Sequence, residues 1–396
     1  MDYSTIISKA AHDIPPSGIR KFFDIAAEMK DCLSLGIGEP DFITAASFSE
    51  AGIASIRDGK TQYTSNNGLY GLRVDICKYV HLLGGPKYSP DDETLVTVGA
   101  SEAIDIALRA VVNPGEEVLI PSPSYVSYAP CVSLTYGIPK PINCLAKNDF
   151  KLTAEELENA ITPRTKALIL PYPNNPTGAI MEREYLEAIA PIIIKHNLVV
   201  ISDEVYSELT YGDAPHLHVS IANIEGMRER TILISGFSKA FAMTGWRIGY
   251  LCAPKELVEI IRKIHQYVIM CAPTASQYAA QTALEESFST NFKTVREMCD
   301  EYNERRVYLV KRLNDMGIEC FEPKGAFYAF PSVESTGLNG EEFAERLLLE
   351  QKVAVVPGIA FGESGKNHIR ISYACSIDTL REALDRIEVF VKSLKA

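Results

Sequence analysis

Five short apolar segments recur along the chain, and each is followed at once by a turn or by polar residues. They span residues 94–98, 118–120, 167–170, 198–202 and 231–234, and stretches with helical periodicity lie between several of them. Short apolar strands that alternate with helices are typical of a mostly parallel sheet with helices on both faces. Because such sheets bind ligands beyond the carboxyl ends of their strands, the residues after each segment are candidates for a binding site.

Side chains with useful chemistry occupy those positions. The residues that come just after predicted strands are Ser101, Tyr125, Asn175, Asp203 and Lys239. Their shared position is the strongest indication from the residues alone that they form one site. The joint at residues 99–103 adds an anion site, because the free N–H groups and the dipole of a helix start both favour a phosphate.

Lys239 and Arg247 suggest what this site binds. Lys239 follows a buried strand among small residues, where a lysine can form a Schiff base with an aldehyde, although most lysines lie on surface loops. Arg247 stands between Gly245 and Gly249 and suits a phosphate, because its planar fork donates two parallel hydrogen bonds. An aldehyde together with a phosphate describes pyridoxal 5′-phosphate (PLP).

Length and charge narrow the class of protein. With 396 residues, of which 46% are hydrophobic, the chain is long enough for about two domains. Its net charge of −12 argues against nucleic acid and anionic membranes as partners. No apolar run reaches the length of a membrane span, and the first residues lack the pattern of a signal peptide.

Cysteine and histidine usage indicates compartment and metal content. Nine scattered cysteines without a CxxC pair favour reduced thiols and a cytoplasmic protein. His216 and His218 are two residues apart and lack further ligands, so we expect a surface loop there and no metal site.

The C-terminal third has a different pattern. Residues 289–316 form a charged helical region, which we interpret as a solvated helix that joins two domains; its basic residues include Arg305, Arg306, Lys311 and Arg312. Residues 324–373 then alternate strands and helices in an α+β pattern. Arg370 stands in a short apolar strand, and a half-buried arginine needs an anion. Spacing alone leaves a ligand and a structural salt bridge equally open for it.

Several motifs together resemble the class I and II aminotransferases, which are fold-type I PLP enzymes, and within them the archaeal aromatic and aspartate group. The motifs are Gly-Glu-Pro-Asp-Phe (38–42), Asn-Asn-Pro-Thr-Gly (174–178), Asp-Glu-Val-Tyr (203–206), Ser-Lys (238–239), Gly-Trp-Arg (245–247) and Arg370. The resemblance implies a large α/β domain with a mostly parallel seven-stranded sheet between helices, and a smaller α+β domain. We expect residues 1–45 to form an arm and part of the small domain, 46–285 the large domain and 286–396 the rest of the small domain.

The resemblance also implies roles for individual residues. Lys239 would bond PLP and shuttle the proton, Asp203 would pair with the pyridine nitrogen, and Tyr125 would stack on the ring. Asn175 and Tyr206 would bond the phenolic oxygen. The phosphate would be held by Ala100, Ser101, Ser238 or Ser235, Arg247 and, from the neighbouring subunit of a homodimer with shared active sites, Tyr63. Arg370, with Asn175 and the Gly38 backbone, would bind the α-carboxylate of the substrate.

The implied reaction moves an amino group between an L-amino acid and a 2-oxoacid by ping-pong kinetics. Aspartate or aromatic amino acids are the expected donors, with glutamate and 2-oxoglutarate as the common pair. Two positions depart from the family pattern: Gly236 stands where many relatives have serine, and Ser101 where some bacterial aspartate enzymes have lysine. A C–S or β-lyase and a cyclising synthase use the same fold, since a fold does not fix a reaction. A non-enzymatic regulator would need an added DNA-binding module, for which this acidic chain has no room.

Overall fold

A seven-stranded sheet forms the centre of the computed structural model, which describes residues 1, 3–15, 29, 31–212 and 218–394. Its spatial order is β2-β8-β7-β6-β5-β3-β4, and only β8 runs antiparallel to its neighbours. The strands are β2 (Thr94–Thr97), β3 (Glu117–Ser122), β4 (Ile138–Asn143), β5 (Thr165–Leu170), β6 (Val199–Asp203), β7 (Thr231–Gly236) and β8 (Gly249–Cys252). This confirms the mostly parallel seven-stranded sheet and all five strands predicted from apolar segments.

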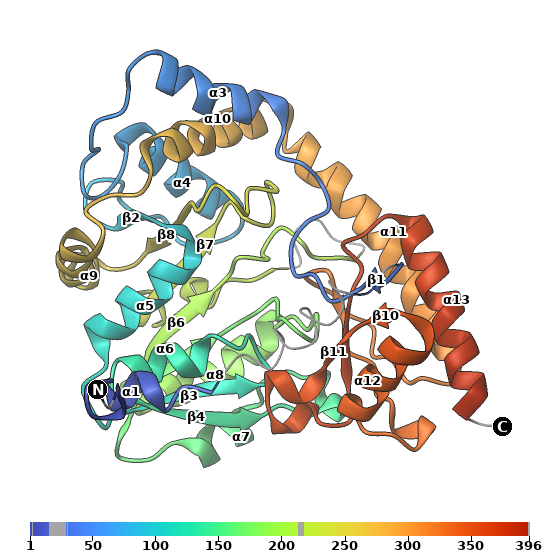
Figure 1. Cartoon of the computed structure of the whole chain (residues 1–396). Coiled ribbons are helices and arrows are strands. Elements are labelled where there is room, and N and C mark those ends of the chain that lie inside the picture. The colour runs from blue at the N-terminus through green and yellow to red at the C-terminus, as the bar shows by residue number, and fades with distance from the viewer. Residues whose placement is uncertain (2, 16–28, 30, 213–217, 395–396) are drawn as a thin grey trace.

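Alternate residues of the strands enter two different hydrophobic layers. Ile120 and Ile169 pack with helices on one face, whereas their neighbours Leu119 and Leu168 pack with helices on the other. A side-chain period of two produces this division. Burial of both faces explains why the five strand segments predicted from the sequence are mostly apolar. Figure 1 shows the helices on either side of the sheet. They are α3 (Ala46–Arg57), α4 (Tyr70–Leu82), α5 (Gly99–Val111), α6 (Tyr128–Leu134), α7 (Ala154–Ala160), α8 (Arg183–Lys195), α9 (Lys255–Val268) and α10 (Thr274–Thr290).

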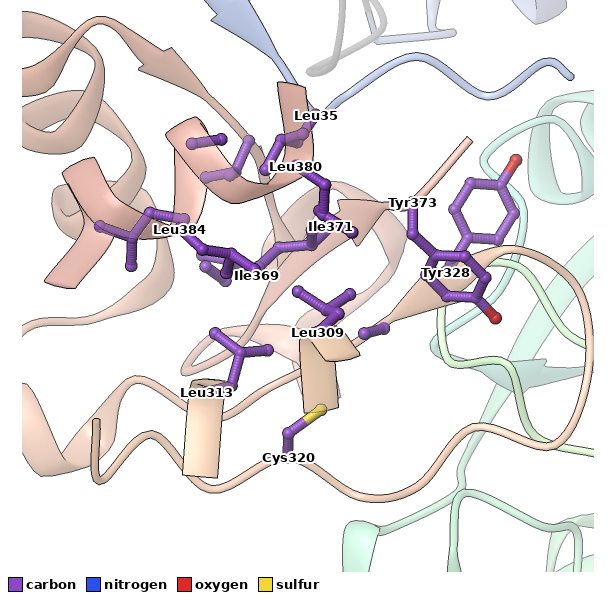
Figure 2. Close-up of a cluster of buried hydrophobic side chains, with 14 of the residues drawn as sticks. Leu35, Leu309, Leu313, Cys320, Tyr328, Ile369, Ile371, Tyr373, Leu380 and Leu384 are labelled. Atoms are coloured by element: carbon purple, nitrogen blue, oxygen red, sulfur yellow. The ribbon is translucent and has the colours of Figure 1, made fainter. Parts of the chain in front are cut away.

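The C-terminal part of the chain builds a second core beside the sheet (Figure 1). Its elements are α11 (Lys293–Asp315), β9 (Tyr328–Ala329), α12 (Gly340–Gln351), β10 (Val353–Ala354), β11 (Val356–Pro357), β12 (Ile369–Ser372) and α13 (Ile377–Leu394). Figure 2 shows Leu309 and Leu313 of α11 facing Ile369 and Ile371 of β12. Leu35 joins this core because β1 (Leu33–Ser34) pairs with β10. A short helix, α1 (Lys9–His12), precedes them.

The helix at residues 289–316 differs from its prediction. It is interrupted at residues 291–292, between α10 and α11, and Arg305 and Arg306 are buried. Arg305 donates to both carboxylate oxygens of Asp41 at 2.9 Å, and Arg306 donates to Glu322 at 2.7 Å. The prediction of a solvated helix was therefore wrong for these two arginines, which are buried and whose charges are paired with carboxylates, as buried charges require. None of the helices among the described residues is long and apolar enough to cross a membrane.

Candidate active site

A cavity of about 420 Å³ lies beyond the carboxyl ends of β5, β6 and β7, where the sheet meets the C-terminal core. The predicted site residues line it, except for Tyr63 and the alternative serine Ser235; they include Ser101 at the start of α5 and Arg370 on β12. Parallel strands bring these residues together because their carboxyl ends share one edge of the sheet. The lining residues that the predictions had named are Gly38, Ala100, Ser101, Tyr125, Asn175, Asp203, Tyr206, Ser238, Lys239, Arg247 and Arg370.

Lys239 projects into this cavity from the turn after β7. Its Nζ atom donates a 2.7 Å hydrogen bond to the carbonyl oxygen of Gly38. Burial lowers the pKa of the Lys239 amine to about 8, and the cationic Arg370 and Arg247 act in the same direction. The carboxylates of Glu39 and Asp203 oppose them. A lysine with this pKa is partly neutral near pH 8, so its amine is available as a nucleophile and as a base.

Asp203 lies at the end of β6 on the floor of the cavity. Burial raises the pKa of its carboxyl group to about 6. Two donors oppose that rise: the hydroxyl of Tyr128, 2.7 Å from Oδ2, and the backbone N–H of Val205, 3.3 Å from Oδ1. A buried carboxylate held in this way suits a cationic partner, because such a partner offsets its desolvation.

Arg370 reaches the opposite wall of the cavity. Its Nη1 donates to Oδ1 of Asn175 at 2.9 Å, and its Nη2 donates to the carbonyl of Gly36 at 2.6 Å. The guanidinium lies between two aromatic rings, 4.6 Å from the centroid of Tyr328 and 4.9 Å from that of Phe361. Neither of the two acceptors of Arg370 is a carboxylate, and among the described residues its buried Nε has no partner. The geometry therefore favours a bound anion over the structural salt bridge that the sequence had left open.

The part of the cavity at the start of α5 has the features of an anion-binding site. Helix α5 begins here, and Arg247 stands so close to it that a Cβ atom on Gly99 would lie 2.8 Å from Nη2 of Arg247. The backbone of Gly99 has a positive φ of 71°, which glycine adopts without strain. The first N–H groups of a helix and a guanidinium together suit a phosphate.

The two alternative serines differ in where they lie. Ser238 lines the cavity, whereas Ser235 faces away and donates to the carbonyl oxygen of Glu204 at 3.2 Å. At position 236, an added Cβ atom would lie 3.1 Å from both Cα of Gly249 and the carbonyl oxygen of Ile248. The close pairing of β7 with β8 thus leaves little room for a side chain at position 236 in this chain.

Tyr63 lies outside this cavity. Its side chain is 77% exposed, and its loop is tied to the segment before α10 by the bond from Asn66 to the carbonyl of Met270. Within a single chain, Tyr63 is therefore not brought to the other site residues.

Four further polar residues line the cavity and were not predicted from the sequence: Tyr128, Tyr328, Thr244 and Glu39. Tyr128 bonds Asp203, and the hydroxyl of Tyr328 lies 3.0 Å from that of Tyr206. Thr244 donates to Glu39 at 3.1 Å. Only Tyr128 carried a usable signal, because it lies three residues after Tyr125, at the start of a helix.

His218 also departs from its prediction. Its side chain is buried, not on the surface, and its Nε2 lies 2.7 Å from Oε2 of Glu204. The hydroxyls of Ser202 and Ser220 donate to the other oxygen of that carboxylate. His216 lies outside the described residues.

Comparison with known proteins identifies relatives over almost the whole chain. Residues 30–387 match the family model for "Aminotransferase class I and II". The chain is 50% identical to a putative aminotransferase, YugH, of Bacillus subtilis, covering 98% of this chain and 99% of that protein. It is 47% identical to an aspartate aminotransferase of Pyrococcus abyssi, with 96% and 97% covered. A solved aromatic aminotransferase from Pyrococcus horikoshii superposes with a TM-score of 0.89 at 44% identity, over 94% of this chain and 99% of that one.

Proposed function

The chain belongs to the class I and II aminotransferases, and from that premise we propose that PLP is its cofactor and that aspartate or aromatic L-amino acids are its donors. As an aminotransferase, it moves an amino group between an amino acid and a 2-oxoacid. The observation that carries the proposal is that one cavity contains a lysine with a lowered pKa, a buried aspartate, an unpaired arginine and a helix start.

The residues present fit PLP. The start of α5 and Arg247 would hold the phosphate, together with Ala100, Ser101 and Ser238, and Asp203 would hold the ring nitrogen. The N–H groups at the start of α5 offer donors, because Val98 at the N-cap has no side-chain acceptor to bond them. The bound cofactor supplies an electron sink for the substrate's α-carbon.

The protein's own groups then divide the work. Nζ of Lys239 would hold the cofactor and would move the proton at the substrate's α-carbon. Asp203 keeps the ring nitrogen protonated, which the charge of a buried carboxylate favours. Tyr125 would cover the ring, while Asn175 and Tyr206 would bond its phenolic oxygen.

Arg370 would bind the substrate's α-carboxylate, with Asn175 and the backbone of Gly38 beside it. Its guanidinium is buried, held by two acceptors and flanked by two rings, so its fork is oriented before substrate binds. A preorganised fork loses little side-chain entropy on binding a carboxylate.

The cavity walls support aromatic donors. Its described lining includes Tyr125, Tyr128, Tyr206 and Tyr328, and its cationic lining residues are Lys239, Arg247 and Arg370. Since each of these cations already has a role in this proposal, the described lining offers no further cation for the second carboxylate of aspartate. Aromatic relatives at 44% identity support the same donor class, while aspartate relatives at 47% keep aspartate among the candidates.

We further propose a homodimer with shared active sites. Exposed apolar side chains surround the loop of Tyr63: Tyr267 is 88% exposed and Val268 is 58% exposed, on the segment that Asn66 bonds. An interface there would bury these side chains and could bring Tyr63 to the partner's phosphate site. Mixing Lys239→Ala chains with Tyr63→Ala chains tests this. Heterodimers regain one intact site, so activity should rise to about a quarter of wild type, whereas independent sites would give no gain.

The compartment and the domain division stay proposals. All nine cysteines are free thiols in the structure, which supports the cytoplasm. The C-terminal core draws most of its residues from Leu35 and from positions beyond residue 285, although it also includes Tyr206, Leu209 and Tyr211, and this supports a division near residues 45 and 285.

A panel of amino acids assayed with 2-oxoglutarate tests the reaction and ranks the donors. We expect tyrosine, phenylalanine and aspartate to yield glutamate and the matching 2-oxoacid. Release of ammonia and pyruvate, without glutamate, would show the alternative C–S or β-lyase instead. An absence of PLP from the purified protein, with no absorbance change on adding it, would contradict the cofactor.

A further inference from the structure

Glu102 and His265 form a buried pair directly behind the start of α5. Oε1 of Glu102 lies 2.7 Å from Nδ1 of His265, and Oε2 of Glu102 accepts the backbone N–H of Val98 at 2.5 Å. A carboxylate only accepts hydrogen bonds, so Nδ1 of His265 carries the hydrogen. One carboxylate thus joins the last turn of α9 to the turn that leads from β2 into α5.

Burying His265 at this position destabilises the fold, which suggests that the residue has a function. Its side chain is 0% exposed, and its Nε2 has no partner among the described residues. A buried nitrogen without a partner destabilises the fold, and an apolar side chain would avoid that cost. The benefit that offsets it is the bond from Nδ1 to Glu102, the only polar contact that its ring makes within the described part of the chain.

The pair acts on the turn whose N–H groups face the cavity. Because the valine at the N-cap has no side-chain acceptor, the turn is held by Glu102 from within α5. The hydroxyl of Thr97 adds a 2.9 Å bond to the carbonyl of Gly99. Without His265, the carboxylate of Glu102 would keep only its bond to Val98. Its negative charge, which lies near the phosphate position, would then be less compensated.

We propose that Glu102 and His265 are positioning residues for the cofactor phosphate: the pair fixes the turn at residues 97–99 so that the first N–H groups of α5 point at the phosphate. This rests on the proposed PLP site and deepens it. His265 touches neither cofactor nor substrate, and its effect passes through Glu102 and the backbone of Val98.

The test compares two ligands that differ only by the phosphate. Apoprotein is titrated with PLP and with pyridoxal, and binding is followed by absorbance. In His265→Leu we expect PLP to bind about tenfold more weakly or worse, while the Kd of pyridoxal changes less than about threefold. Inorganic phosphate should raise the melting temperature of the wild-type apoprotein more than that of the variant.

Further variants keep the test decisive. Glu102→Gln retains an acceptor for Val98 but loses the charge, so adding His265→Leu to it should weaken PLP binding less than in the wild-type background. Asp105→Asn is the matched control, because it removes a carboxylate from the same helix, where Asp105 pairs with Arg109 at the surface. If His265→Leu does not fold, Glu102→Gln and His265→Gln are measured in the same way.

The outcomes separate this inference from the proposed function. Equal weakening of PLP and pyridoxal, or no weakening of either, would overturn the positioning role. If the wild-type protein itself bound PLP no better than pyridoxal, the proposed phosphate site would fail, whatever the variants did.

Discussion

Nη1 of Arg370 lies 2.9 Å from Oδ1 of Asn175, although 195 residues separate them in the chain. The bond joins β12 of the C-terminal core to the loop that follows β5 of the central sheet. The two residues that we place at the substrate carboxylate therefore hold each other. Each orients the other before any ligand arrives.

Replacing Arg370 by lysine should keep a charge but lose the fork. We expect kcat/KM to fall for all amino-acid donors together, by roughly 1.5–3 kcal/mol, the size of a charge-assisted hydrogen bond. Amines without an α-carboxylate should be far less affected, and the Kd of PLP should stay unchanged. Steady-state kinetics with both kinds of donor check this, with the exposed Arg381→Lys as the control. Weakened PLP binding with intact donor kinetics would make Arg370 a cofactor or structural residue.

Replacing Tyr128 by phenylalanine removes the hydroxyl that donates to Oδ2 of Asp203. That hydrogen bond lowers the pKa of Asp203, so its loss should raise the pKa further. The acidic limb of the pH profile of kcat/KM should then move to higher pH. Tyr136→Phe is the control, because Tyr136 is exposed just beyond α6. An unmoved acidic limb would mean that Tyr128 does not tune Asp203 in the working enzyme.

Removing the carboxylate of Asp203 should reduce turnover more than removing the hydroxyl of Tyr128. In Asp203→Ala we expect turnover to fall on the order of 10²- to 10³-fold, the effect of losing one preorganised electrostatic partner. The fold should persist, since the buried carboxylate costs more desolvation than its two donors recover. Single-turnover kinetics and circular dichroism measure the two effects separately. Turnover near the wild-type rate would assign the ring nitrogen to another group.

Lys239 gives a prediction about stability as well as activity. Its folded pKa of about 8 lies below its ordinary value of 10.5. The unfolded chain therefore binds more protons between these values, and stability rises with pH across that window. Below about pH 8 the folded apoprotein bears the full cost of the buried charge, at most about 3 kcal/mol for this shift.

Lys239→Met should abolish turnover and yet raise the unfolding free energy of the apoprotein at pH 7. That gain should shrink above pH 8 and vanish near pH 10.5. Denaturant unfolding at several pH values checks the trend, with Lys263→Met, an exposed lysine of α9, as the control. A gain that does not depend on pH would show that packing, not charge, separates the variants.

The sequence predicted those elements that can be recognised from a pattern among neighbouring residues. The five apolar strands could be recognised from their own runs of apolar residues. Residues at their carboxyl ends, such as Asp203 and Lys239, could be recognised because they follow those runs. Strand β4 was missed because it contains Pro139 and Pro141 and is largely exposed at the edge of the sheet, so it lacks an apolar run. Strand β8 was missed because it is short and runs antiparallel, directly after the turn that contains Arg247.

The missed site residues depended on distant partners. Tyr328 lies 122 positions from Tyr206, and nothing in the residues around it indicates that their hydroxyls meet. The residues around His218 are typical of a surface loop. Its side chain is buried because it bonds Glu204. The charged pattern of α11 likewise hides the two arginines that turn inward. Only the path of the chain in three dimensions distinguishes such residues from solvated ones.

The carbonyls of Gly36 and Gly38 accept from Arg370 and from Lys239 respectively. Two carbonyls separated by a single residue can be no more than about 7 Å apart along the chain. The reactive amine after β7 and the carboxylate-binding guanidinium on β12 are thus both bonded to one tripeptide, which ties the sheet to the C-terminal core at the site. A substrate whose amino and carboxyl groups share one carbon suits two groups that are held by the same short segment.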